Sequence, residues 1–162
     1  MSDDEKFLEQ FESTVWPKED WHHKQHVKVA YLYLRHYPLE AAAARLREKI
    51  KAYNAAKKVE ESLLSGYHET MTQAWLRLVH FTLCEYGPAE NAEDFYAQNP
   101  QLSQKKTLRF FYTKELFTSP KAKVEFVSPD LTSLPQSKKS FALNGEKLVA
   151  QVNREVPVKK IA

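Results

Sequence analysis

The stretch from Tyr67 to Tyr86, YHETMTQAWLRLVHFTLCEY, most constrains the fold of this chain. Its apolar residues recur every three or four positions, which predicts a helix that must bury one face. Gly66 precedes the stretch, and Gly87-Pro88 follows it as the expected end of a helix. The chain has only three glycines, too few for a turn-rich all-β protein. The sequence therefore predicts a fold built on long helices.

Similar spacing and breaks predict further helices along the chain. Pro38 is well placed as a first helical residue, and Asp20 is a candidate N-cap for the helix before it. We expect a short amphipathic helix at 4–14 and longer helices at 21–36, 38–57 and 67–86. Short helices are expected at 91–98 and 120–126, and residues 102–117 are expected to be helical at least through Phe111. The predicted fold class is all-α, an up-down helical bundle of about four main helices plus short helices.

The character of the chain changes near its end. We expect residues 1–135 to form the bundle domain and residues 136–162 a polar tail that is irregular or hairpin-like. Asn144-Gly145 is a hairpin-type turn within that tail.

Composition narrows the classes of function. The net charge of +3, from 24 basic and 21 acidic residues, is too balanced to suggest a nucleic-acid partner. The single cysteine, Cys84, excludes an internal disulfide and cysteine-rich zinc ligation. No apolar run approaches the ~20 residues of a membrane span, and the N-terminus lacks an apolar signal core. We therefore expect a cytoplasmic protein without a membrane partner.

Three histidines fall on core-facing stripes near helix starts. His23 aligns with Val27, Ala30 and Leu34, His26 shares its face, and His68 opens the stripe of the 67–86 helix. Short connections make helices 21–36, 38–57 and 67–86 antiparallel in turn. The first and third then start at the same end of the bundle, so the three imidazoles should converge there.

Convergent imidazoles predict a metal site. Neutral imidazole binds zinc, iron, copper or nickel, and helix N-termini disfavour the charged form. We expect His23, His26, His68 and Glu69 as ligands of a divalent transition metal. Glu69 could instead orient a histidine or act as the catalytic base on a bound water. The same helix ends also favour an anionic small molecule.

Other polar residues are candidates for contacts to a substrate. Tyr67, Arg109 and Tyr112 fall near the predicted polar end of the bundle, and arginine is well suited to carboxylates. Arginine at the end of a bundle is more often the partner of a surface ion pair. The chain has no phosphate-binding loop, dinucleotide-binding glycine motif or serine elbow.

Three ordered segments carry a resemblance to a known group. WHHKQHV at 21–27, YHET at 67–70 and FVSPDL at 126–131 resemble segments of a family of small, mainly bacterial, functionally uncharacterised all-helical proteins. The resemblance covers about residues 7–135 and places His23, His26, His68 and Glu69 on the motif positions. His22 stands where that family usually has threonine, which suggests that His22 is not a required ligand.

Three functions follow from these patterns. The first is a small metal-binding protein, expected to be a hydrolytic or oxidative enzyme acting on a small molecule. The second is a metal-free binding module for an anionic small molecule. The third is a protein-interaction domain with structural histidines.

Overall fold

The computed structural model describes residues 1–144, which form an all-α fold. The α-helices are α1 (Asp3–Glu12), α2 (His23–His36), α3 (Leu39–Ala56), α4 (Glu69–Tyr86), α5 (Ala92–Gln98), α6 (Lys114–Phe117) and α7 (Pro120–Val124). Three 3-10 helices are η1 (Lys18–Asp20), η2 (Pro100–Ser103) and η3 (Lys105–Phe110). Residues 1–144 contain no strand, and their one β-bridge joins Ser62 to Ser65. The predicted all-α class is confirmed.

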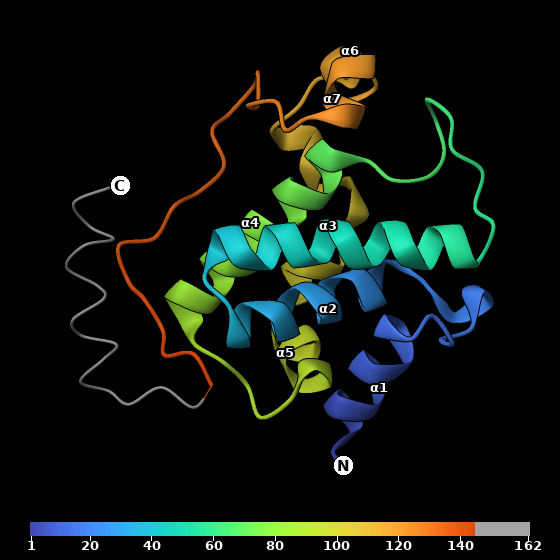
Figure 1. Ribbon diagram of the computed structural model, residues 1–162. Helices are drawn as coiled ribbons and strands as arrows, with labels where there is room; N and C mark the ends of the chain where they lie inside the picture. Colours follow the sequence, from blue (N-terminus) through green and yellow to red (C-terminus); the bar gives the residue numbers. More distant parts are fainter. Residues whose placement is uncertain (145–162) are drawn as a thin grey trace.

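Helices α2 and α4 run in the same direction, and α3 runs opposite to both (Figure 1). At one end, the His23 ring of α2 contacts the Trp75 ring of α4. At the other end, Arg35 of α2 and His80 of α4 both contact the ring of Phe141. The starts of α2 and α4 therefore lie at the same end of the bundle, as the short connections predict.

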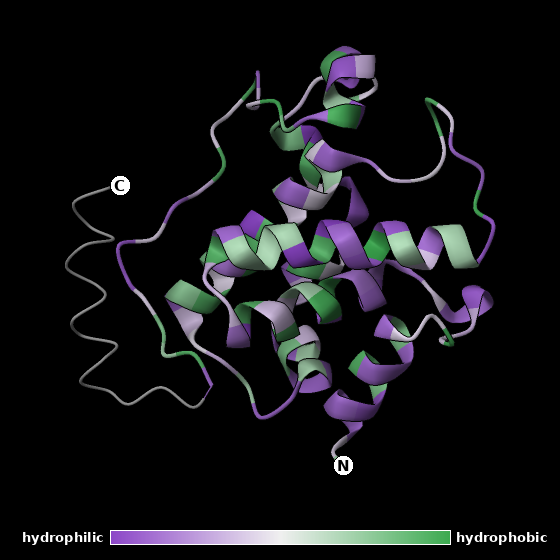
Figure 2. Ribbon diagram, in the orientation of Figure 1, coloured by the Kyte–Doolittle hydropathy of each residue, from purple (hydrophilic) through white to green (hydrophobic). Residues whose placement is uncertain are grey.

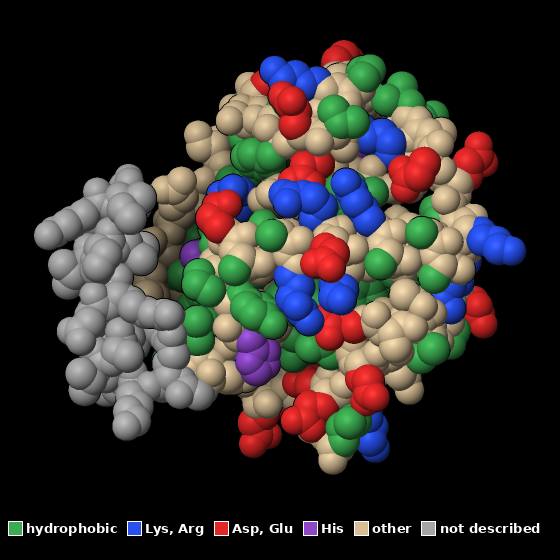
Figure 3. Space-filling view, viewed as in Figure 1, with side chains coloured by type: hydrophobic (Ala, Val, Ile, Leu, Met, Phe, Trp, Pro, Cys, Tyr) green, Lys and Arg blue, Asp and Glu red, His purple; other side chains and the backbone are tan. Residues whose placement is uncertain are grey.

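The core lies where the helices face one another. Apolar residues recur along each helix between polar ones (Figure 2), because each helix buries one face. Phe11 of α1 is fully buried and stacks on Trp21, with ring centroids 4.8 Å apart. On the face that α3 covers, basic and acidic side chains are interspersed (Figure 3).

Several helix boundaries differ from the expected ones. The N-cap of α2 is His22 rather than Asp20, and the N-cap of α4 is His68, so this histidine lies before the helix. The segment expected to be helical within 102–117 consists of 3-10 turns and then the short helix α6. The Thr113 hydroxyl accepts the Leu116 N–H and so caps the start of α6, beyond Phe111, through which the helix was expected to run at least.

Residues 136–144 lie along the bundle. Arg35 donates to the Ala142 carbonyl at 2.5 Å and to the Asn144 side chain at 2.8 Å, and its own carbonyl accepts the Asn144 N–H at 2.6 Å. Glu85 of α4 accepts the Ser137 hydroxyl at 2.7 Å. This part of the predicted tail is thus attached to α2 and α4, and the rest of the tail, 145–162, lies outside the described residues.

Candidate functional site

A cavity of about 980 Å³ lies at the end of the bundle where α2 and α4 start. Its floor is apolar and comes from several elements. The floor residues are Ala30 of α2, Leu46 and Ile50 of α3, Trp75 and Leu76 of α4, and Leu108 of η3, all buried. Since these residues also belong to the main core, the cavity is a hollow in the core itself.

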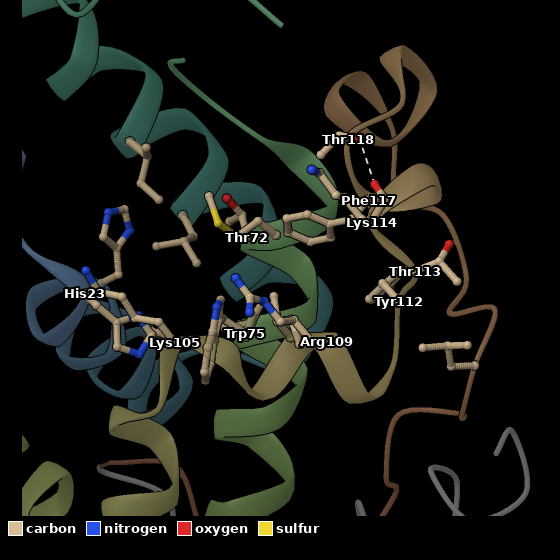
Figure 4. A pocket seen from close by; sticks show the side chains of 18 of the residues that line it. His23, Thr72, Trp75, Lys105, Arg109, Tyr112, Thr113, Lys114, Phe117 and Thr118 are labelled. Carbon is tan, nitrogen blue, oxygen red and sulfur yellow. Dashed lines mark hydrogen bonds between the residues drawn. The ribbon is translucent and has the colours of Figure 1, made fainter. Parts of the chain in front are cut away.

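The rim of the cavity carries three basic side chains and one acidic one. Lys105, Arg109 and Lys114 line it together with Glu115, and all four are exposed. Within residues 1–144 none of the three cations forms an ion pair. Lys105 and Arg109 lie toward the Trp75 side and Lys114 toward Phe117 (Figure 4). The rim therefore has an excess of positive charge over an apolar floor.

His23 and His26 both line the cavity. His23 Nε2 donates to the Leu102 carbonyl at 2.7 Å, so Nε2 carries the proton and Nδ1 is the free acceptor. Burial and the nearby His23 lower the pKa of His26 to about 4, and burial likewise lowers the pKa of His23. We therefore expect both rings to be neutral at pH 7, chiefly because they are desolvated.

His68 uses both ring nitrogens in contacts within the protein. Nδ1 accepts the Met71 N–H at 2.9 Å, and Nε2 donates to the Phe117 carbonyl at 2.9 Å. The ring also stacks on the Phe117 ring, with centroids 4.7 Å apart. His68 thus caps α4 and ties it to α6, and the residues that line the cavity do not include it.

Glu69 is buried in a network of its own. Arg47 of α3 donates to both carboxylate oxygens, at 2.8 and 2.7 Å, Tyr67 Oη donates at 2.6 Å and Gln73 Nε2 at 3.0 Å. Burial alone would raise the pKa of Glu69, but these hydrogen bonds outweigh it and lower the pKa to about 2. Neither Glu69 nor Tyr67 lines the cavity.

The expected metal ligands are therefore divided between two places. His23 and His26 face the cavity, whereas His68 and Glu69 have protein partners behind its wall. Among residues 1–144, no group of three or more histidine, cysteine or acidic side chains is arranged to hold a metal ion. A metal on all four residues would have to replace the hydrogen bonds of His68 and Glu69.

The candidate substrate residues are divided in the same way. Arg109 and Tyr112 lie on the cavity wall, Arg109 at the rim and Tyr112 buried. The Tyr112 hydroxyl donates to the Val127 carbonyl at 2.8 Å. Tyr67 instead donates to Glu69 and does not reach the cavity.

Two of the three sequence segments that carry the resemblance, YHET at 67–70 and FVSPDL at 126–131, meet beside the cavity. The Thr70 hydroxyl donates to the Glu125 carbonyl at 2.9 Å and accepts the Val127 N–H at 3.1 Å. Asp130 accepts the backbone N–H and the hydroxyl of Thr113, at 2.8 and 2.6 Å. These bonds hold the segment after α7 against the start of α4 and against the cavity wall.

The candidate residues chosen from the sequence did not include Lys105, Lys114 or Trp75. Lys105 and Arg109 are four residues apart, a spacing that predicts a shared face on an α-helix, but lysines at such spacing are common on solvated surfaces. Arg47 offered no signal, because its partner Glu69 lies 22 residues further along the chain.

Two further findings concern the chain as a whole. Within residues 1–144, every helix is too short or too polar to cross a membrane. No family model, curated protein or solved structure matches the chain.

Proposed function

We propose that the cavity binds a small organic anion with an apolar body, without need of a metal. The observation that carries the proposal is an apolar hollow whose rim holds three cations with no carboxylate partner among residues 1–144. This is the second of the three functions predicted from the sequence. It is compatible with the expected cytoplasmic location.

The size and the lining suit such a ligand. Small-molecule sites commonly have volumes of about 300–1,000 Å³ and mostly apolar walls with a few polar groups, and this cavity has about 980 Å³. Buried leucine, isoleucine and tryptophan side chains would contact the body of the ligand. Burial of each methylene there would contribute about 0.8 kcal/mol.

The charges suit an anionic head group at the rim. Arg109 can donate two parallel hydrogen bonds to a carboxylate, and Lys105 and Lys114 add positive charge. Glu115 is the one acidic residue of the lining, so the rim has a net charge of about +2 by formal count. Because His23 and His26 are expected to be neutral, they would add no charge next to the apolar body of the ligand.

The test is calorimetric titration of metal-free protein with hexanoate and with hexanol. We expect hexanoate to bind at least about tenfold more tightly, since a charge-assisted hydrogen bond contributes about 1.5–3 kcal/mol. Arg109→Gln should remove most of that preference and Lys105→Gln part of it. Lys106→Gln is the matched control, because Lys106 is equally exposed but does not line the cavity. Equal binding of acid and alcohol by the wild type would refute the proposal.

A metal centre is a second candidate, supported by the two neutral imidazoles that line one cavity. A metal there would have open positions for water and could support hydrolytic or oxidative chemistry. Metal analysis of protein purified without a histidine tag tests it, with zinc, iron, copper and nickel each titrated into His23→Ala and wild-type protein. If the wild type binds stoichiometric metal and His23→Ala does not, the metal centre is favoured over the first candidate.

A further inference from the structure

A second cavity, of about 590 Å³, lies next to the first along α4. Met71, Thr72, Trp75 and Leu76 face the main cavity, and Trp75, Leu78, Phe81, Thr82 and Tyr86 face the second. On the opposite side, residues 105–118 line the main cavity and residues 98–107 the second. The two hollows therefore lie one after the other between α4 and the segment 98–118.

Trp75 is the residue of α4 that faces both cavities. The residue is only 9% exposed, so the indole is buried rather than projecting from the surface. Together the two cavities follow α4 from Met71 to Tyr86, a rise of about 22 Å. Because Trp75 is the lining residue of α4 that the two cavities share, we expect its removal to join them into a single elongated channel.

The position of the indole is fixed by its neighbour. The His23 ring meets Trp75 edge-on, with centroids 4.4 Å apart and an interplanar angle of 62°. His23 is held in turn by its hydrogen bond to the carbonyl of Leu102, whose side chain lines the second cavity. Helix α2, helix α4 and η2 thus meet at this one contact.

We propose that Trp75 is a specificity-determining residue that closes the main cavity toward the second one and so limits the length of the organic anion that can bind. The inference rests on the proposed function and adds the ligand class, an unbranched carboxylate whose chain ends against the indole.

The test is a chain-length profile. Straight-chain carboxylates from butyrate to laurate and the alkanols of the same lengths are titrated into each variant by calorimetry. In the wild type, affinity should rise about fourfold per methylene and then level off or fall at a limiting length. Trp75→Leu should move that limit to longer chains in both series.

Two further variants make the result specific. Leu78 faces the second cavity but not the main one, so Leu78→Phe added to Trp75→Leu should refill the channel and restore the shorter limit. Met71→Ala is the matched control, because it enlarges the main cavity at a partly exposed position and should leave the limit unchanged. If Trp75→Leu does not fold, as thermal unfolding would show, Trp75→Phe takes its place and should give a smaller extension.

The outcomes separate the two proposals. An unchanged limit in a folded Trp75 variant, or an equal extension by Met71→Ala, overturns the role of Trp75 and leaves the anion preference intact. If alcohols bind the wild type as tightly as acids, the anion preference is overturned. The role of Trp75 is then still tested by whether the limiting chain length of the alcohols shifts in the Trp75 variant. If neither series binds the wild type, both proposals are overturned.

Discussion

Arg47 and Glu69 form a two-point ion pair between α3 and the first turn of α4, with nitrogen–oxygen distances of 2.8 and 2.7 Å. The glutamate side chain of the pair is 8% exposed. Since Tyr67 and Gln73 donate to the same carboxylate, its charge is fully compensated where the residue is buried. Glu69 is therefore a structural residue of the wall behind the cavity, where sequence alone suggested a ligand or a base.

Glu69→Gln should destabilise the protein by about 2–3 kcal/mol, because charge-assisted hydrogen bonds are lost and buried donors are left without an acceptor. Urea unfolding followed by circular dichroism measures the loss. Glu48→Gln is the control, since Glu48 is exposed beside Arg47 on α3 and should change the free energy of unfolding by less than about 0.5 kcal/mol. Equal losses in the two variants would contradict the structural role.

Acid should weaken the protein first through His26. Its pKa is about 4 in the folded state against an ordinary 6.5, so the unfolded chain takes up the proton first. The stability due to the neutral ring is fully present above pH 6.5 and is lost as pH falls toward 4, by up to about 3 kcal/mol. Unfolding at several pH values in wild type and His26→Phe checks this, and the variant should show a shallower slope in that window.

The exposed His36 gives the control for His26, and His36→Asn should keep the wild-type slope of stability against pH.

At lower pH a second loss of stability should follow, through Glu69. Its pKa is lowered from 4.5 to about 2, so its contribution is present above pH 4.5 and disappears as pH falls toward 2. A profile that is flat from pH 7 to 4 would contradict the burial of His26.

His68 should act as a helix cap whether or not a metal is present. His68→Ala removes the acceptor for the Met71 N–H and should cost about 1–2 kcal/mol, whereas His68→Asn supplies another side-chain acceptor and should cost less. Thermal unfolding with and without a chelator measures both effects. A chelator that lowers the melting temperature of the wild type but not of either variant would instead make His68 a metal ligand.

Gly66 should not tolerate a side chain. Its φ is +89°, and an added Cβ would lie 2.3 Å from the Glu61 carboxylate, which accepts the Tyr67 N–H. Gly66→Ala should therefore cost about 1 kcal/mol or more from the backbone alone, seen as a lower melting temperature. Glu61→Ala in the same chain removes the clash and should recover part of the loss.

The sequence predicted the helices with strong apolar spacing and the common end of α2 and α4, because these follow from local periodicity and short connections. For the same reason it brought His23 and His26 to one end of the bundle, whereas Arg109 and Tyr112 were chosen for the chemistry of their side chains. It could not show that His68, unlike His23 and His26, does not line the cavity. The partners of His68, the Phe117 carbonyl and the Met71 N–H, are backbone groups that carry no sequence signal.

The 3-10 turns at 100–110 were also beyond prediction. Lys105 to Phe110 have helical spacing between Pro100 and the cap at Thr113, and that spacing does not distinguish 3-10 turns from a short α-helix. The result is a wall whose backbone hydrogen bonds are of poorer geometry than those of α4.

This construction of η3 has a kinetic consequence. We expect η3, which carries Lys105 and Arg109, to open at a lower free energy than α4, since short 3-10 turns are released more readily than an eighteen-residue helix. Entry and exit of a ligand would then pass through transient unwinding of this wall. The time for which a ligand stays bound would depend on how often η3 opens as well as on how well the floor fits.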